Sequence, residues 1–278
     1  MKEKKNDEFF ITFQSEGQRH FNQLYFVNKK EFIKGCGSYL FNGNEYIYDK
    51  TMYEKQKLLF ELCKTNNKVL EIGSYMGHSI LIMLLANPKI QITAIDSNHI
   101  FSKPSLEYLQ EQFPESKITF IHNDSLKALS NLKEKFDLFH VDGSHRHEII
   151  SKEFLSLFNL IEGNKMSVLF DDVITMQHLK NNILKNFEII KNLSPNSNAP
   201  NLYVEIKLDR KLIEENIKNF KLENFKIFLK YRLVKILTRK TVRNKIIRNR
   251  ITIKLWNLFF EDFVVFRKFR EKLFQYIS

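Results

Sequence analysis

The chain has 278 residues, of which 43% are hydrophobic and 27% are charged, a balance typical of a globular rather than a disordered protein. This length allows one large α/β domain with an appendage, or two small domains. No stretch approaches the roughly 18 consecutive apolar residues that a membrane-spanning helix needs. The first ten residues, MKEKKNDEFF, lack the apolar core of a signal peptide, so we expect a cytoplasmic protein.

The formal net charge of +12 arises in the C-terminal part of the chain. Residues 211–278 contain 18 Lys and Arg against 6 Asp and Glu, whereas residues 1–210 carry equal numbers of both signs. We therefore divide the chain into an N-terminal segment (1–50), a central domain (51–210) and a basic tail (211–278). The N-terminal segment is rich in aromatic residues and interrupted by glycines, and we expect it to be irregular.

From residue 67 on, short apolar runs rich in β-branched residues alternate with helical patterns, which is typical of βαβ units. A helix over 52–64 leads into the first strand. The clearest later helix covers 146–161, where apolar residues recur at i, i+4, i+7, i+8 and i+11 and so share one face. The five predicted parallel strands cover residues 68–72, 91–95, 117–122, 136–141 and 167–170.

Two further strands, 187–193 and 201–208, are separated by the turn-forming segment SPNSNAP. Adjacent strands joined by a turn are antiparallel. We therefore predict an α/β fold with a mostly parallel, seven-stranded sheet that ends in an antiparallel hairpin. A dinucleotide-binding domain would instead end in a sixth parallel strand.

The first strand runs into a glycine turn and then a helix, in the sequence VLEIGSYMGHS (69–79). Gly73 lets the backbone approach a ligand closely, and Gly77 frees the turn into the helix. The N–H groups at the helix start are placed to face an anion, and Glu71 is placed to hold an ammonium group. Alone, such a turn is a weak indication of a nucleotide cofactor.

Polar residues also follow the next two strands. Asp96 closes the second strand, where an acid commonly accepts both ribose hydroxyls. Asp124 and Ser125 follow the third strand and are placed to meet an adenine ring. Asp96 alone is more often a helix cap than a ribose ligand. The joint occurrence of these residues at successive strand ends indicates a nucleotide-containing cofactor, and the absence of G-x-G-x-x-G argues against NAD.

The turn VLEIGSYMGHS resembles the cofactor motif of the catechol O-methyltransferase group, strand-Glu-x-Gly-x-x-x-Gly-x-Ser, and the resemblance covers roughly residues 50–208. It implies a Rossmann-like class I methyltransferase that uses S-adenosyl-L-methionine. Carried over position by position, it implies that the methionine part of the cofactor contacts Glu71, Gly73, Tyr75 and Ser79. It likewise assigns the ribose to Asp96.

Three carboxylates follow the fourth and fifth strands: Asp142, Asp171 and Asp172. Because neighbouring strands lie about 5 Å apart, these groups should converge at the cofactor edge. Like charges require a cationic partner, and a divalent ion, Mg²⁺ by default, suits oxygen ligands. The alternative is a turn at Asp142 and a helix cap at Asp171 and Asp172.

The Asp … Asp-Asp pattern resembles the metal-dependent macrolide-sugar O-methyltransferases; the catechol enzymes carry Asp … Asp-Asn. In the catechol enzymes, a lysine three residues after the first metal-binding Asp is the general base. Here that position is His145, whose imidazole, with a pKa near 6.5 when unperturbed, is a suitable base. We therefore take Asp142 and His145 as the catalytic pair.

The tail from 226 to 254 carries 11 Lys and Arg and no acid, with apolar residues at helical spacing, and continues into aromatic residues. A basic amphipathic helix over 226–260 suits an anionic membrane surface, which would place the protein on the inner membrane face. The tail could instead pack on the central domain or on a second copy of the chain. It contains no known RNA-binding motif, which disfavours nucleic acid.

Together these features predict metal-assisted methyl transfer to a hydroxyl of a sugar, a glycan or another small molecule. One alternative is a metal-independent methyltransferase acting on nucleic acid, although the N/D-P-P-Y/F motif of amino-methylating enzymes is absent. The other is a cofactor-binding protein without catalytic activity whose tail recruits partners to a membrane.

Overall fold

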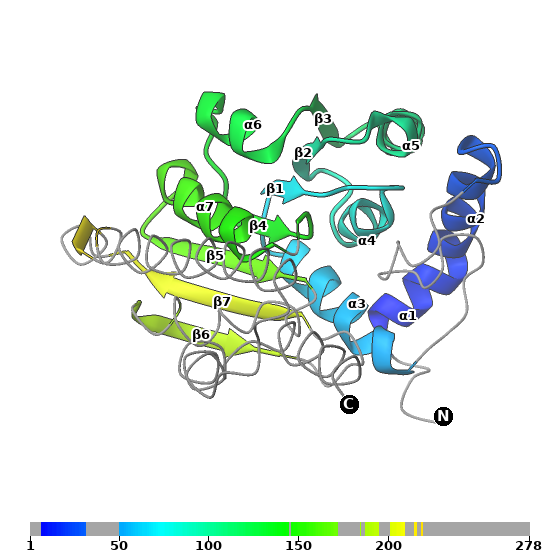
Figure 1. Ribbon diagram of the computed structural model, residues 1–278. Helices are drawn as coiled ribbons and strands as arrows, with labels where there is room; N and C mark the ends of the chain where they lie inside the picture. Colours follow the sequence, from blue (N-terminus) through cyan, green and yellow to red (C-terminus); the bar gives the residue numbers. More distant parts are fainter. Residues whose placement is uncertain are drawn as a thin grey trace, which may run out of the picture. The chain divides into compact units, whose positions relative to one another are not determined.

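In a computed structural model of the chain, seven strands form one sheet in the order β3-β2-β1-β4-β5-β7-β6 (Figure 1). Strands β1 to β5 are parallel, and β7 runs antiparallel to both β5 and β6. The predicted fold class, including the terminal hairpin, is therefore confirmed. The strands are β1 (Lys68–Ile72), β2 (Gln91–Asp96), β3 (Lys117–His122), β4 (Leu138–Val141), β5 (Lys165–Phe170), β6 (Ile189–Leu193) and β7 (Leu202–Lys207).

The structure describes residues 7–31, 50–144, 146–171, 184, 187–194, 201–208, 214, 215 and 218. The chain divides into two compact units, 1–218 and 219–278, and all described residues belong to the first. The predicted membrane-binding helix over 226–260 lies outside the described residues.

The helices are α1 (Glu8–Thr12), the π-helical η2 (Phe13–Gly17), α2 (Gln18–Val27), α3 (Lys50–Cys63), α4 (His78–Ala86), α5 (His99–Gln112), α6 (Ser125–Asn131), α7 (His147–Leu157) and the 3₁₀-helical η4 (Phe158–Leu160). Figure 1 shows α6 and α7 on one side of the sheet, with α3, α4, α5 and the N-terminal helices on the other. None of the helices described is long and apolar enough to cross a bilayer.

Helix α4 is the centre of the larger helical layer. Its sequence, HSILIMLLA, is apolar on all sides, which is typical of a helix buried on every face. Its side chains share one core cluster with residues of β1, β2 and β4. Helices η2, α2 and α3 also pack against it. Strand β1 is likewise buried on both faces, as expected for an inner parallel strand. The end of β1 and the start of α4 are thus held rigidly.

The prediction of an irregular N-terminal segment is wrong for residues 8–27, which are helical. The aromatic residues are the reason, because they provide a buried helix face rather than a loop. Phe9 and Phe13 lie one turn apart, and Phe21 and Leu24 continue the buried side. Phe9 also packs 5.3 Å from the ring of Phe60 on α3, measured between centroids.

Candidate active site at the carboxyl ends of the strands

The turn after β1 depends on glycines in the left-handed backbone conformation, with φ of +88° at Gly73 and +72° at Gly77. A Cβ atom on Gly73 would lie 2.3 Å from the backbone oxygen of Asp142, so no side chain fits there. The ends of β1 and β4 therefore touch at this point. The strand order reverses between β1 and β4, which is where open α/β sheets bind their ligands.

Glu71 is fully buried near the end of β1. Its Oε1 accepts a hydrogen bond from Ser79 Oγ at 2.5 Å and lies 2.8 Å from His140 Nδ1 on β4. Its Oε2 is also buried, and no hydrogen-bond donor reaches it from the described part of the chain. A buried carboxylate oxygen without a donor costs free energy. This oxygen is therefore suited to receive a cationic ligand group.

Asp96, at the end of β2, organises the glycine turn. Its Oδ2 accepts hydrogen bonds from the backbone N–H groups of Ser74 at 3.0 Å and Tyr75 at 2.8 Å, and from Ser102 Oγ at 2.9 Å. Its Oδ1 accepts one hydrogen bond, from Asn98 N at 2.8 Å. The carboxylate thus fixes the turn and keeps acceptor capacity on Oδ1 for a further donor.

Asp142 and Asp171 follow the neighbouring strands β4 and β5, whose last residues are paired in register. Asp142 is half-buried, whereas Asp171 is fully buried and forms an ion pair with Lys55 of α3, which is also fully buried. The pKa of the Asp142 carboxyl is raised well above its usual value, first by burial and then by the charge of Asp171; Lys55 opposes this. The cluster already contains a cation.

Residues 70–173 match a family described as a methyltransferase domain. The match spans β1 to β5 with the turns described above. This chain contains a class I methyltransferase domain. S-adenosyl-L-methionine is the methyl donor of that class, and the resemblance inferred from the sequence is confirmed at this level.

Two curated relatives from Arabidopsis thaliana are similar to part of the methyltransferase domain. One, assigned to the caffeoyl-CoA O-methyltransferases, is 37% identical over 89 residues, which cover 31% of this chain and 38% of the relative. The other, tapetum-specific methyltransferase 1, is 29% identical over 103 residues, covering 35% of this chain and 44% of the relative. The chain thus matches less than half the length of either relative.

Among solved structures, the Podospora anserina methyltransferase PaMTH1, bound to S-adenosylhomocysteine, superposes with a TM-score of 0.52 at 12% identity. The superposition covers 68% of this chain and 88% of PaMTH1. At this identity the likeness concerns the fold alone. It supports the α/β fold described above.

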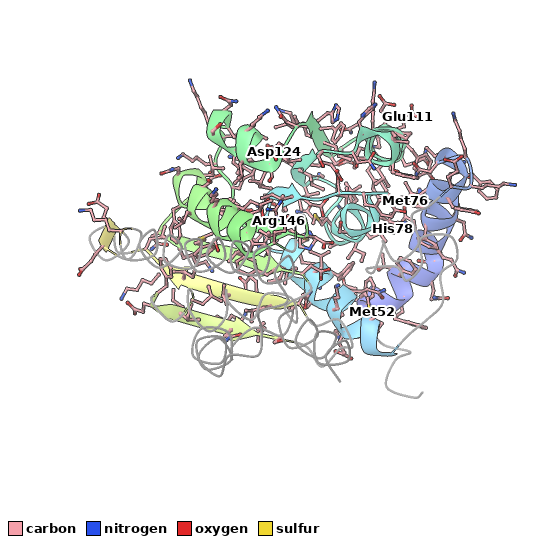
Figure 2. The ribbon with its side chains drawn as sticks, in the orientation of Figure 1. Met52, Met76, His78, Glu111, Asp124 and Arg146 are labelled. Carbon is pink, nitrogen blue, oxygen red and sulfur yellow. The ribbon has the colours of Figure 1, made fainter. Side chains whose placement is uncertain are left out.

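Asp124 and Ser125 begin α6, on the other side of the sheet from His78 and α4 (Figure 2). Asp124 is the N-cap, and its Oδ1 accepts hydrogen bonds from Leu126 N and Lys127 N. Ser125 Oγ donates to Glu153 Oε1 at 2.5 Å. Asp124 therefore caps α6, and its predicted contact with adenine stays a prediction.

Two residues of the predicted metal and base set, Asp172 and His145, lie outside the described residues. Among those that are described, no three His, Cys, Asp or Glu side chains are arranged to hold a metal ion. Asp142 and Asp171 do lie at adjacent strand ends, as expected. Because Asp171 is paired with Lys55, these two carboxylates do not offer a divalent ion a free ligand set.

Sequence reasoning missed two members of the site, Lys55 and His140. Lys55 lies on a helix whose pattern marks its apolar residues but does not indicate which polar side chain reaches a strand end. His140 occupies a position in the run FDLFHVD that alternation alone assigns to the core, and it is indeed fully buried. The available signal was the acid on the adjacent strand: His140 is directly paired in register with Glu71.

Proposed function

We propose that this chain is an S-adenosyl-L-methionine-dependent O-methyltransferase that acts on a hydroxyl of a small molecule. The observation that carries the proposal is the buried Glu71 Oε2 near the end of β1, an acceptor that no donor reaches among the described residues. The match of residues 70–173 to a methyltransferase domain supports it, as does the similarity to a protein assigned to the caffeoyl-CoA O-methyltransferases.

In the proposed complex, Glu71 Oε2 accepts the ammonium group of the methionine part, while Oε1 remains held by Ser79 and His140. The N–H groups of His78 and Ser79, at the start of α4, face the carboxylate, because a helix N-terminus favours an anion. Gly77 N already donates to Ser74 O at 2.7 Å, so Gly77 contributes the shape of the turn. Gly73 and Tyr75 of the turn border the same part of the cofactor.

The nucleoside part follows along the edge of the sheet. Asp96 Oδ1 accepts a ribose hydroxyl, since it receives one hydrogen bond from the described residues and a carboxylate oxygen accepts two. Asp124 and Ser125 border the adenine at the start of α6. Their own hydrogen bonds fix this wall of the subsite.

The acceptor hydroxyl lies, in this proposal, beside Asp142. Its oxygen attacks the methyl carbon of the cofactor, the new O–C bond forms as the C–S bond breaks, and S-adenosylhomocysteine leaves. The proton of the hydroxyl passes to a base, for which the sequence assigns His145. Because the reaction is a direct displacement, positioning and electrostatics supply most of the acceleration.

The metal predicted at Asp142, Asp171 and Asp172 has no part in these steps, because Lys55 already pairs with Asp171. The sugar or glycan acceptor and the anionic membrane surface at residues 226–260 remain proposals that rest on the sequence. An acceptor panel that contains phenolic acyl thioesters, free catechols and nucleotide sugars separates these substrate classes, with methyl transfer from labelled S-adenosyl-L-methionine as the readout.

Isothermal titration of S-adenosylhomocysteine into the full chain tests the cofactor site. We expect binding by the wild type and an affinity at least about 10-fold lower for Glu71→Gln, which removes the charge but keeps the shape. Glu162→Gln is the matched control, because Glu162 pairs with Lys68 at the opposite end of β1 and is exposed. No binding by the wild type, or unchanged binding by a folded Glu71→Gln, would contradict the proposal.

A further inference from the structure

The carboxylates at the ends of β4 and β5 share their surroundings with a buried lysine. Lys55 and Asp171 both have side chains with 0% exposure, and they form an ion pair. Asp142 lies close enough to interact electrostatically with Asp171, Lys55 and Glu71. Lys55 comes from α3, outside the strand ends that build the rest of the site.

The ammonium of Lys55 has the electrostatic role that the sequence assigned to a divalent ion. A buried carboxylate is strongly destabilising unless a positive charge compensates it. Lys55 provides that compensation directly, at Asp171 Oδ1. A metal ion bound to Asp171 would sit beside this ammonium, and the repulsion between the two cations in a region of low polarity would oppose binding.

The burial of Asp171 also opposes binding of a metal ion. Both carboxylate oxygens of Asp171 are shielded from solvent. A hydrated divalent ion therefore reaches them only if α3 or the strand end moves and Lys55 withdraws. Asp142 is half-buried, and one carboxylate alone holds Mg²⁺ weakly in competition with water.

We propose that Lys55 is the resident cation of this cluster: it neutralises Asp171, positions Asp142 through that pair, and keeps divalent metal out of the site. This inference rests on the proposed function only in taking Asp142 as the residue beside the acceptor. Lys55 is a positioning residue, since its buried ammonium acts on the site through Asp171. Methyl transfer by this chain is accordingly insensitive to chelators.

The test is a titration of Mn²⁺ followed by electron paramagnetic resonance, on the full wild-type chain and on Lys55→Met. The wild type is expected to bind no Mn²⁺ below the millimolar range. Lys55→Met, which keeps the length of the side chain but not its charge, is expected to gain a Mn²⁺ site, because Asp171 then lacks its cation. A purely structural role of Lys55 would produce no such gain.

Thermal unfolding supplies the second readout. Without metal, Lys55→Met is expected to lower the melting temperature by on the order of 10 °C, since it leaves a buried charge unpaired. The double variant Lys55→Met/Asp171→Asn is expected to recover most of that loss and to bind no Mn²⁺. Equal destabilisation of the single and double variants would contradict a role in neutralising Asp171.

The proposal is overturned if the wild type binds one Mn²⁺ per chain at micromolar concentration and Asp171→Asn abolishes the binding. This wild-type result decides the matter even if Lys55→Met fails to fold. Titration of S-adenosylhomocysteine, with and without EDTA, separates this proposal from the proposed function. Loss of cofactor binding under both conditions contradicts the function, whereas loss with EDTA alone contradicts the role of Lys55.

Discussion

His140 Nδ1 lies 2.8 Å from Glu71 Oε1, and both side chains are fully buried on adjacent strands. If the carboxylate is ionised, Nδ1 must carry the proton, because a carboxylate oxygen only accepts. Together with the bond from Ser79, this contact fixes the rotamer of Glu71 and leaves Oε2 available at the turn. The hydrogen bonds to Oε1 thus orient Oε2, the oxygen that we propose receives the cofactor.

Replacing His140 is therefore expected to weaken cofactor binding through Glu71, which it orients. We expect His140→Leu to lower the affinity for S-adenosylhomocysteine about 10-fold, because a hydrogen bond to a charged group contributes roughly 1.5–3 kcal/mol. His140→Asn, whose amide N–H can replace Nδ1–H, should recover most of the affinity. Calorimetric titration measures both variants, and equal affinities for the Leu and Asn variants would refute the orienting role.

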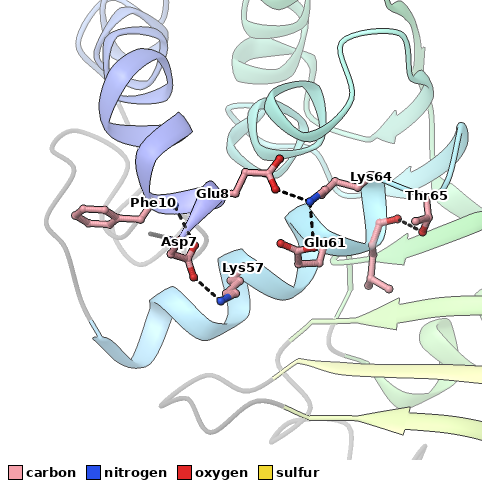
Figure 3. Close-up of polar contacts among 8 residues, drawn as sticks. Asp7, Glu8, Phe10, Lys57, Glu61, Lys64 and Thr65 are labelled. Atoms are coloured by element: carbon pink, nitrogen blue, oxygen red, sulfur yellow. Dashed lines mark hydrogen bonds and ion pairs between the residues drawn. The ribbon is translucent and has the colours of Figure 1, made fainter. Parts of the chain in front are cut away.

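The N-terminal helices are attached to the domain by two ion pairs of unequal burial (Figure 3). Asp7 caps α1 through a hydrogen bond from Phe10 N at 3.2 Å and pairs with Lys57, and its side chain is 11% exposed. Glu8 pairs with Lys64, and its side chain is 60% exposed. Burial raises the pKa of Asp7, but the hydrogen bonds from Lys57, Tyr53 and Phe10 outweigh it, so that this pKa is lowered overall.

Because the pKa of Asp7 is lower in the folded state, its contribution to stability is present above the unfolded value near 3.9 and disappears as the pH falls through the folded value. We expect Asp7→Ala to cost about 1–2 kcal/mol of unfolding free energy at pH 7. The cost should shrink below pH 4. Glu8→Ala is the matched control, with a loss below about 1 kcal/mol. Urea denaturation at pH 7 and pH 3 measures the loss of unfolding free energy for both variants. A larger loss for Glu8→Ala than for Asp7→Ala at pH 7 would contradict the prediction.

The sequence predicts the backbone of this site better than the contacts of its side chains. The strands, the hairpin and the left-handed turn at Gly73 follow from local patterns, because alternating apolar runs and glycine spacing act over a few residues. The partners of the buried charges do not follow. Lys55 meets Asp171 across 116 positions of sequence, and only the packing of α3 against the domain brings the two side chains together.

The N-terminal helices illustrate a second limit. Aromatic residues lower helix propensity only slightly, so that a segment rich in Phe becomes helical once a surface exists to bury it. In residues 8–27 that surface is provided by α3, α4 and α5. The local sequence around Phe9 and Phe21 does not indicate these helices, because the residues that the two rings contact lie far along the chain.

His78, the first residue of α4, is a buried imidazole in apolar surroundings. Its ring centroid lies 5.0 Å from that of Phe21, and neither ring nitrogen has a hydrogen-bond partner among the described residues. Burial lowers the pKa of His78 to about 3. The unfolded chain therefore binds a proton near pH 6.5 that the folded chain excludes, so the stability of the protein falls as the pH drops below 6.5.

We expect His78→Leu to remove this acid sensitivity. The difference in unfolding free energy between variant and wild type should grow by up to about 1.4 kcal/mol per pH unit from pH 6 to pH 4, in favour of the variant. At pH 7.5 the variant should be at least as stable, because two unpaired polar atoms are lost. Denaturant titrations along the pH series measure this, and parallel curves for the two proteins would show that His78 is protonated in the folded state.

A comparison of Gly73 with Gly163 separates the steric effect of a side chain in the glycine turn from the strain of a positive φ alone. Both have positive φ, +88° and +96°. A Cβ on Gly73 would overlap the backbone of Asp142, whereas a Cβ on Gly163 would meet nothing within 4 Å. Alanine at Gly163 thus costs strain alone, about 1–2 kcal/mol, while alanine at Gly73 must also push the ends of β1 and β4 apart.

We therefore expect Gly163→Ala to retain the affinity of the wild type for S-adenosylhomocysteine, with a melting temperature lower by a few degrees. Gly73→Ala should lose at least about 10-fold in affinity and more in stability, because the displaced turn moves Tyr75 away from Asp96 and shifts Glu71. Differential scanning fluorimetry and calorimetric titration give the two quantities. Similar losses for both variants would mean that the contact between Gly73 and Asp142 does not shape the cofactor site.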